Sequence, residues 1–449
     1  MTFRSLVLSN VQGNWRSYIA FFMSSVFSVM TFYIYAAFLA HPDVVSGHIA
    51  AAAKVRKGMV FCEYVIIIFS FLFVLYSNLS FFKTRKREFG LFSLFGMTRE
   101  QLRKFIIYEN MTIAVLAIGV GIGLGIVFSK LFFMALGVML DIKDTIVFAV
   151  PPAAVWLTVR TFFMLFAIIS LWIALRMRRI EMVDLFITSQ QPKGQLVYSP
   201  WLAGLAVVCI VTSYSMALML NVPYFDLMIT LILITVLIGT YLLFTQVSIM
   251  LLGFIQKRVG IYYHRTNMII FAQIGYKLKD NARMLFIVAI LSAVILTVTS
   301  ATYMLALAVD YQDIKTQYDN SKEVISLTMF IGMFISLLFF IASGSMIYFK
   351  LFTDLQEDQV QFKALSRIGM TQGEIRQVVF TQVSIIFFLP CIVGIIHALV
   401  AMKALDHFLM LSNWYYSFII IGIYVIMQTI FFLITCHSYM KSIMHEVAS

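Results

Sequence analysis

Long apolar runs constrain this chain more than any other feature of its sequence. Ten stretches of roughly 20 or more residues carry almost no charge, and polar breaks separate them. A helix needs roughly 20 apolar residues to cross the hydrocarbon layer of a membrane, where each backbone polar group must be paired inside the segment. The runs are continuous and do not alternate, which excludes transmembrane strands. The pattern predicts an all-α polytopic membrane protein with ten spans.

The composition agrees with this prediction. Of the 449 residues, 61% are hydrophobic and 12% are charged, so the chain has too few polar side chains to cover a soluble core. Disorder is excluded as well, because apolar residues are too many. The predicted spans are Tyr18–Ala40, Met59–Phe82, Ile107–Leu136, Ala153–Leu175, Trp201–Leu220, Leu227–Ile255, Leu285–Leu307, Val324–Phe349, Val378–Met402 and Trp414–Cys436.

The distribution of basic residues predicts the orientation. Ten spans put both termini on one side, and 24 of the 33 Lys and Arg residues flank that side against 7 on the other. Basic residues favour the cytoplasm, so we expect both termini there. Lys54, Arg56 and Lys57 are an exception just before the second span. They are either an anchor at the headgroups or a contact with an anionic lipid. The net charge of +12 is explained by topology and does not indicate nucleic-acid binding.

Two polar segments of the chain repeat each other. The run Gly96-Met97-Thr98 after the second span returns as Gly369-Met370-Thr371 after the eighth, and Phe89 pairs with Phe362 at the same spacing. We call this constant spacing the repeat offset. A period this long indicates a duplication. Six spans separate corresponding positions, and an even number predicts parallel repeats related by an axis along the membrane normal.

The duplication predicts the domain organisation. We expect an N-terminal interfacial helix at residues 1–16, a first four-span half at 17–190, a linker pair of spans at 199–256 and a second four-span half at 260–449. A second interfacial helix is expected over Tyr262–Asp280, before the seventh span. Two like halves in one chain are typical of a transporter or of a mechanical transmitter that would otherwise be a homodimer.

The repeated segment has a helical, amphipathic pattern. Gly96 is expected to end one helix, and Thr98 to cap the next. A helix lying along the cytoplasmic face either rests among headgroups or docks a soluble partner. Its duplication favours docking, because a dimeric partner needs two equal docking points. The candidate coupling residues are Arg85, Arg87, Glu88, Phe89, Phe92, Phe95 and Gly96 in the first half and Phe362, Leu365, Ile368 and Gly369 in the second.

Other chemistry-bearing patterns predict no catalytic site. The chain has no GxxxxGK[ST] phosphate loop, and its histidines have no metal-ligand spacing. Glycines of the run Gly119–Gly125 form small-xxx-small pairs that favour close helix packing. Ionisable residues inside spans suggest function. Glu63 and Lys130 are candidates for an ion pair or a lipid contact, whereas Glu109 is expected at the cytoplasmic interface. Pro390 is expected to kink the ninth span.

The sequence resembles a known family. RKREFGLFSLFGMTREQLRKFIIYEN (85–110), FIASGSMIYFK (340–350) and LSRIGMTQGEI (365–375) are similar to FtsX-like permeases, and most to the Bce-type permeases of bacitracin and lantibiotic resistance. The resemblance implies a non-enzymatic membrane subunit of an ABC transporter in the bacterial cytoplasmic membrane. The implied partners are two ATPase subunits that bind ATP and Mg²⁺, a sensor histidine kinase, and an anionic lipid or lipid-linked cell-wall precursor. No cofactor, metal or nucleic acid is implied for this chain.

One departure from the family keeps alternatives open. Bce-type permeases carry a large extracellular domain between the seventh and eighth spans, whereas here only residues 308–322 join them. The domain is either naturally shortened or has been removed. Three other functions remain: an FtsX-type transmitter that regulates a cell-wall hydrolase, an ATP-independent secondary transporter, and a signalling scaffold. Co-purification with an ATPase would separate the permease from the secondary transporter.

Overall fold

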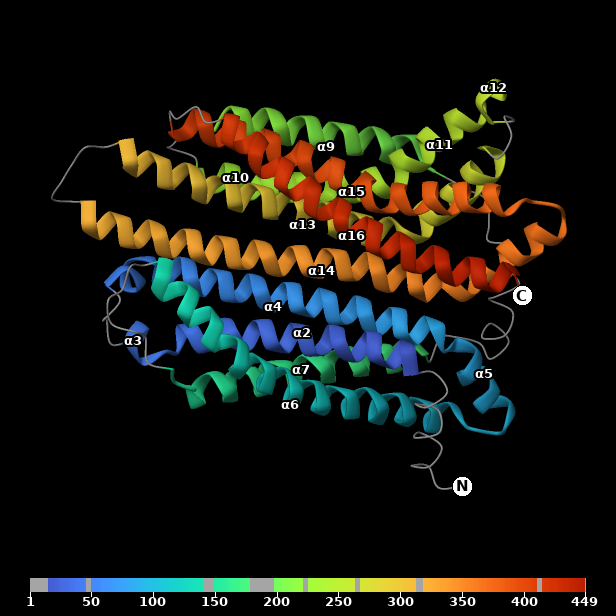
Figure 1. Cartoon of the computed structure of the whole chain (residues 1–449), viewed down its shortest axis with the longest axis horizontal. Helices are drawn as coiled ribbons and strands as arrows, with labels where there is room; N and C mark the ends of the chain where they lie inside the picture. Colours follow the sequence, from blue (N-terminus) through green and yellow to red (C-terminus); the bar gives the residue numbers. More distant parts are fainter. Residues whose placement is uncertain are drawn as a thin grey trace. The chain divides into compact units, whose positions relative to one another are not determined.

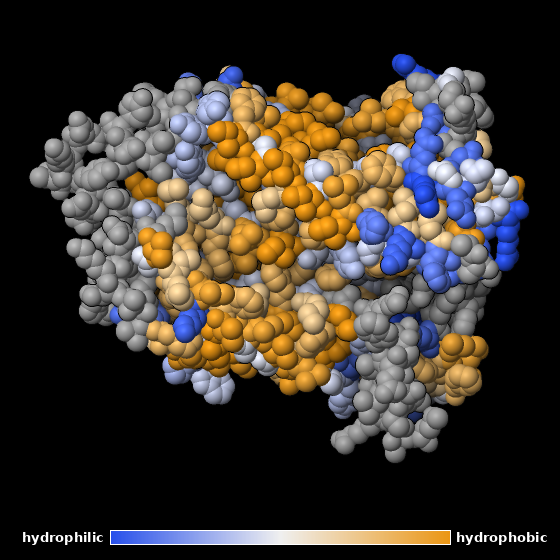
Figure 2. Space-filling model, viewed as in Figure 1, coloured by the Kyte–Doolittle hydropathy of each residue, from blue (hydrophilic) through white to orange (hydrophobic). Residues whose placement is uncertain are grey.

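A computed structural model describes residues 15–45, 50–139, 148–177, 198–220, 225–262, 267–311, 318–409 and 414–448 of the chain. Within these ranges the structure contains ten helices that are long and apolar enough to cross a membrane, which confirms the predicted all-α polytopic fold. On the face drawn in Figure 2, hydrophobic side chains cover most of the helical surface, as expected where helices meet lipid. Residues 1–14, where the N-terminal interfacial helix was expected, lie outside the described ranges.

The chain divides into two compact units. Unit 1 comprises Met1–Pro192 with Asp313–Ile331, and unit 2 comprises Lys193–Gln312 with Gly332–Ser449. The helices of unit 1 are α2 (Trp15–Leu39), α3 (Pro42–Val45), α4 (Ala50–Thr84), α5 (Lys86–Leu94), α6 (Arg99–Met139) and α7 (Pro152–Met177). The long helix α14 (Tyr318–Arg367) begins in unit 1 and continues in unit 2.

The remaining helices belong to unit 2. They are α9 (Pro200–Leu218), α10 (Phe225–Leu242), the π-helical turn η2 (Leu243–Val247), α11 (Ser248–Gln256), α12 (Val259–Tyr262), α13 (Asn267–Tyr311), α15 (Gln372–Leu409) and α16 (Trp414–Ala448). Together α10, η2 and α11 form the sixth span. The predicted linker pair, α9 with α10 to α11, packs on α13 and α15 and is therefore part of unit 2.

Helix α2 is the centre of unit 1. It packs against α4, α6 and α7, and Figure 1 shows these four helices running along one another. Gly121 on α6 permits this packing, because a β-carbon there would lie 2.7 Å from the Val29 Cβ on α2. Gly125 has the same role, with a β-carbon position 2.6 Å from the ring of Tyr33. Of the four glycines in this run, Gly119 and Gly123 have no atom within 4 Å of a β-carbon and do not contribute to the contact.

The corresponding crossing in unit 2 joins α13 and α15. Gly394, which corresponds to Gly121 at the repeat offset, would place a β-carbon 2.5 Å from the Ser292 Cβ on α13. Duplicated helices therefore cross at duplicated glycines, as close helix packing in a membrane requires. Farther along α15, His397 is buried and its two ring nitrogens lie 2.7 Å from the Tyr214 hydroxyl and 2.9 Å from the Thr240 hydroxyl. These two contacts attach the linker pair to α15.

The start of the seventh span needs a correction. The predicted separate helix over Tyr262–Asp280 does not form, because α12 ends at Tyr262 and α13 runs without interruption from Asn267 to Tyr311. Its polar residues lie instead on the first turns of a membrane-spanning helix, where buried partners satisfy them. Only residues 312–317 separate α13 from α14, which agrees with the short connection seen in the sequence.

Candidate coupling site

The same helix–turn–helix motif occurs once in each unit. Between α5 and α6, Gly96 has a φ of +88°, and between α14 and α15, Gly369 has a φ of +108°. In the first turn Gly96 N–H donates to the Ser93 carbonyl and Met97 N–H to the Phe92 carbonyl; the second turn repeats both bonds at the equivalent positions. This is the Schellman arrangement, which needs a glycine because a side chain disfavours positive φ.

Reciprocal capping begins the helix after each turn. Thr98 N–H donates to the Gln101 side chain, and Gln101 N–H returns a bond to the Thr98 hydroxyl. Thr371 and Glu374 form the same box, and the Thr371 hydroxyl makes one further bond to the Glu374 carboxylate. The two boxes satisfy N–H groups that the first helical turn leaves unpaired. We call the end of each unit that carries its glycine turn the turn end.

The turns separate the predicted coupling residues into two groups. Phe95 and Ile368, next to the glycines, are 85% and 83% exposed. Phe89 and its counterpart Phe362 are both buried at 1% exposure, and Phe89 stacks on Phe82. Phe92 contacts Phe105 on α6, and Leu365 is half-buried. Only the exposed group offers surface to a partner, while the buried group attaches the turn to its unit.

The second coupling segment is not a separate helix. The helix predicted over Glu357–Ile368 does not start anew, because α14 continues through this segment without a break and ends at Arg367. In unit 1 the corresponding path is interrupted at Arg85, which has φ −101° and ψ 6° between α4 and α5. The two segments therefore share a turn but enter it differently.

Arg85 is the buried centre of the turn end of unit 1. Its guanidinium lies 2.6 Å from the Glu109 carboxylate on α6 and 2.8 Å from Glu88 on α5, with a side-chain exposure of 1%. Tyr18 on α2 donates a hydrogen bond to the same Glu109 carboxylate. One ion-pair cluster thus holds α2, α5 and α6 together.

The surroundings of Arg85 favour its charged form. The guanidinium carbon lies 4.9 Å from the centre of the Tyr18 ring and 5.1 Å from that of Phe89, which suits a cation. Burial alone lowers the pKa of Arg85, but the Glu109 carboxylate raises it and the net direction is upward. Tyr18 precedes the first span of the structure, which begins at Phe21. Burial and the nearby Glu109 raise the pKa of Tyr18, so its hydroxyl keeps the proton that it donates.

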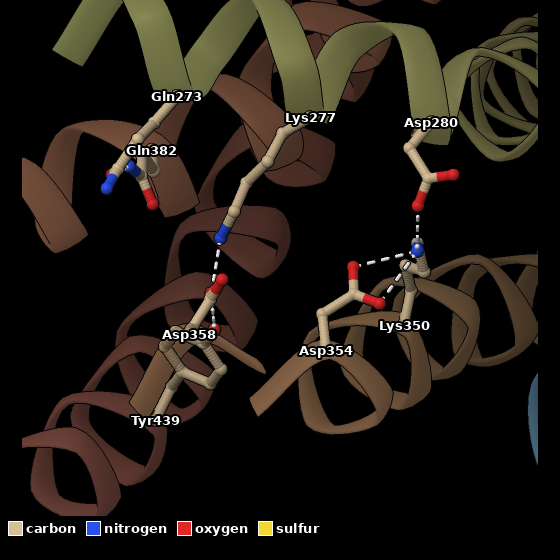
Figure 3. Close-up of polar contacts among 8 residues, drawn as sticks. All are labelled: Gln273, Lys277, Asp280, Lys350, Asp354, Asp358, Gln382 and Tyr439. Atoms are coloured by element: carbon tan, nitrogen blue, oxygen red, sulfur yellow. Dashed lines mark hydrogen bonds and ion pairs between the residues drawn. The ribbon is translucent and has the colours of Figure 1, made fainter. Parts of the chain in front are cut away.

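A different cluster occupies the turn end of unit 2. Asp358 on α14, the counterpart of Arg85 at the repeat offset, lies 2.5 Å from Lys277 Nζ on α13 and accepts a hydrogen bond from Tyr439 on α16. Figure 3 shows both side chains converging on this carboxylate. All three side chains are buried or nearly so. The charge at the central position is reversed between the halves, and the fourth helix of the half replaces the third as a partner.

Further polar contacts continue the cluster along α13. Lys350 on α14 lies 3.0 Å from Asp280 and 2.7 Å from Asp354. Gln273 accepts a hydrogen bond from Gln382 on α15, the counterpart of Glu109. Gln273, Lys277 and Asp280 are spaced i, i+4, i+7 and share one face of α13, which Figure 3 shows turned toward α14 and α15. Among the described residues, no group of three His, Cys, Asp or Glu is arranged to hold a metal ion.

The comparisons with known proteins match this duplicated architecture. The FtsX-like permease C-terminal family matches residues 61–182 and again 333–447, which together exceed half of the chain. The chain belongs to the FtsX-like permease family. The starts of the two matches, at positions 61 and 333, are separated by nearly the repeat offset, and each match contains one of the two turns.

Relatives of this FtsX-like permease are subunits of ABC transporters. The uncharacterized ABC transporter permease YvcS of Bacillus subtilis (strain 168) is 27% identical over 646 positions that cover all of both chains. ABC transporter permease protein YxdM of the same organism is 28% identical, covering 98% of this chain and 99% of YxdM. The bacitracin export permease protein BceB of Bacillus subtilis (strain 168) is 25% identical to this chain, and the match covers 68% of this chain and 48% of BceB. The chain is therefore an ABC transporter permease, a multi-pass membrane subunit, and this role implies an ATPase partner.

The alignment with YvcS is longer than this chain. Its 449 residues align with YvcS over 646 positions, so 197 positions of that alignment hold no residue of this chain. A surplus of this size is that of a typical domain.

The other candidate residues of the permease lie at the opposite end of unit 1 from its turn. Arg56, Lys57 and Lys130 are exposed and Glu63 is half-buried; no ion pair joins Glu63 to Lys130, although both are within the described residues. The side chains of Lys54 and Arg87 lie outside what the structure describes. The predicted pairing of Glu63 with Lys130 is thus not formed, and a lipid contact remains the alternative.

Sequence reasoning missed the clusters of the permease. Glu109, expected at the membrane interface, is buried with Arg85, and the pairing of Lys277 with the distant Asp358 was not foreseen. One available signal was the i, i+4, i+7 spacing of polar residues at the start of α13. A second signal was the reversal of charge between positions 85 and 358 of an otherwise repeated segment.

Proposed function

We propose that this permease confers resistance to cell-wall-active antimicrobial peptides, by converting closure of its ATPase subunits into release of the peptide from a lipid-linked cell-wall precursor. The duplicated glycine turn, which leaves Phe95 exposed in one half and Ile368 exposed in the other, is the observation that carries the proposal. Support for the substrate class comes from the similarity to a bacitracin export permease, over about half of that relative.

The proposed orientation puts both turn ends and both termini in the cytoplasm. The excess of basic residues on that side supports it. Each exposed turn then docks on one of two ATPase copies, which bind ATP and Mg²⁺ and supply the energy. Because the two turns have the same backbone geometry, two identical subunits meet two equivalent contacts. Closure of the ATPase pair draws the two turns along and changes the conformation of the helices that follow them, α6 and α15.

The opposite, extracytoplasmic end is the proposed site of lipid recognition. Arg56 and Lys57 are exposed on α4, and Phe61 and Tyr64, next along the helix, are exposed as well. Basic residues above an apolar, lipid-facing surface suit an anionic headgroup with its acyl chain. A sensor histidine kinase, expected from the Bce-type resemblance, is the proposed second partner.

Docking is tested by making the exposed turn residues acidic. Phe95→Asp combined with Ile368→Asp should reduce co-purification of the ATPase at least tenfold, because two apolar contacts are replaced by charges. The matched control is Lys441→Asp, which changes the net charge by the same amount at an exposed position of α16 away from both turns. Membrane insertion is followed by the yield of purified permease. Full recovery of the ATPase with the double variant would contradict docking at these turns.

Lipid recognition is tested by reversing the charge of the basic cluster before the second span. Changing Lys54, Arg56 and Lys57 to Glu should lower the inhibitory concentration of bacitracin, used as the probe peptide, severalfold, because an anionic headgroup is repelled. Lys403→Glu, at another exposed position on the same proposed side, is the control. Unchanged resistance in the triple variant would leave the cluster as a membrane anchor.

A further inference from the structure

The ends of α14 and α16 are joined by more than one contact. Asp358 accepts the hydrogen bond of Tyr439, and the neighbouring Gln359 donates to the Ser442 carbonyl at 2.9 Å. One turn farther along each helix, Lys363 lies 3.0 Å from Glu446. The three contacts follow the two helices in the same direction and end shortly before Gly369.

The first of these contacts is anchored in the unit. Asp358 is 5% exposed and also pairs with Lys277 on α13, so its carboxylate is fixed by two neighbours. A buried pair of this kind is costly to break, because one charge would be left without its partner. The outer contact of Lys363 with Glu446 is partly exposed and is weak by itself. The connection between α14 and α16 is therefore firmest at the buried contacts of Asp358, which we call the buried node, and weaker toward the turn.

Unit 1 has no equivalent of this arrangement among its described residues, because Arg85 engages α2 and α6 instead. The comparison indicates that the fourth helix of the second half, α16, supports the segment before the turn. Helix α16 continues to Ala448, past the end predicted for its span at Cys436, and this part of the helix contacts the segment that leads into the turn.

We propose that residues 358–367 of α14 and 439–446 of α16 form one two-helix lever, and that Asp358, Lys277 and Tyr439 are positioning residues that transmit motion of the second turn to α13. The C-terminal end of α16 then takes part in transmitting motion from the ATPase to the membrane-spanning helices. This inference rests on the proposed docking of an ATPase at the turn.

The lever predicts that coupling can be lost while docking persists. Asp358→Asn removes the ion pair with Lys277, and Tyr439→Phe removes the hydrogen bond to Asp358. Both substitutions keep the shape of the side chain and leave Ile368 exposed. We expect at least half of the ATPase to co-purify with each variant, and resistance to bacitracin to fall at least fourfold. His437→Ala, at an exposed position of α16 outside residues 439–446, is the control and should change neither. Full resistance in both variants would overturn the lever, and so would a parallel loss of ATPase binding.

A charge exchange at the exposed end tests the lever without disturbing the buried node. Lys363→Glu and Glu446→Lys should each lower resistance at least twofold, and the double variant should restore it, because the pair is re-formed with reversed sign. Failure of the double variant to restore resistance would overturn the proposed contribution of this pair. If wild-type permease recovers no ATPase or gives no protection against bacitracin, the proposed function itself fails, which is distinct from these outcomes.

Discussion

The two turn ends share a backbone motif and differ in what holds it. Both have a Schellman turn at a glycine followed by a capping box, and both bury one phenylalanine, Phe89 or Phe362. In unit 1 a buried arginine pairs with a glutamate of the helix after the turn, whereas in unit 2 a buried aspartate pairs with residues of the first and fourth helices.

This difference shows that the exposed turn and the buried cluster beneath it meet different requirements. The exposed turn must stay alike in both halves if two identical ATPase subunits are to dock on it. The buried node only has to fix the segment to its own unit, and either sign of charge serves when its partner is present. Duplicated sequences therefore diverged at positions 85 and 358 while the turns were kept.

The largest expected effect is on the buried nodes. Arg85→Met leaves Glu109 buried without its cation and should lower the free energy of unfolding by about 3–5 kcal/mol. Asp358→Met, which abandons Lys277, should have an effect of the same size. Thermal unfolding of the purified permease measures both. Arg85→Met combined with Glu109→Gln, which copies Gln382 of unit 2, should recover most of the loss; a double variant as unstable as the single one would contradict the ion-pair explanation.

A smaller effect is expected at the glycine turns. No atom lies within 4 Å of a β-carbon at Gly96 or Gly369, so an alanine there costs only the backbone strain of positive φ, about 1–2 kcal/mol. Gly369→Ala should be the more costly, because its φ of +108° lies farther from the left-handed helical region than +88°. Asparagine at each position should cost less than alanine. The unfolding temperature ranks the variants, and a smaller loss at Gly369 would count against this reading.

The smallest effect should come from the caps. Replacing an N-cap threonine by alanine typically costs about 1 kcal/mol. Thr371→Ala should exceed Thr98→Ala, because Thr371 bonds a carboxylate near a helix N-terminus, where negative charge is favoured, whereas Thr98 bonds a neutral amide. In a Glu374→Gln background, Thr371→Ala should lower the unfolding temperature by the same amount as Thr98→Ala does. Equal losses before that change would show that the carboxylate adds nothing.

The sequence by itself determined the architecture. Apolar runs long enough to cross a membrane specify helices, because lipid leaves no other way to pair the backbone, and the structure contains the ten predicted spans. The repeat of Gly-Met-Thr marked both turns, since a helix end at glycine and a start at threonine are local preferences that need no distant partner. Helix ends were less accurate: α14 continues to Arg367, well beyond the predicted end of its span at Phe349, because buried partners stabilise the charged extension.

Only the tertiary structure decided which candidate residues face a partner and which face the core. Phe89 and Phe95 lie close together in one amphipathic segment, yet one is buried and the other is exposed, because the turn lifts Phe95 off the helix bundle. Arg85 and Asp358 acquire their roles from Glu109 and Lys277, which lie on other helices. A pattern along the chain indicates that such charges need partners, but the partner is chosen by helix packing, which brings distant turns of different helices to the same depth.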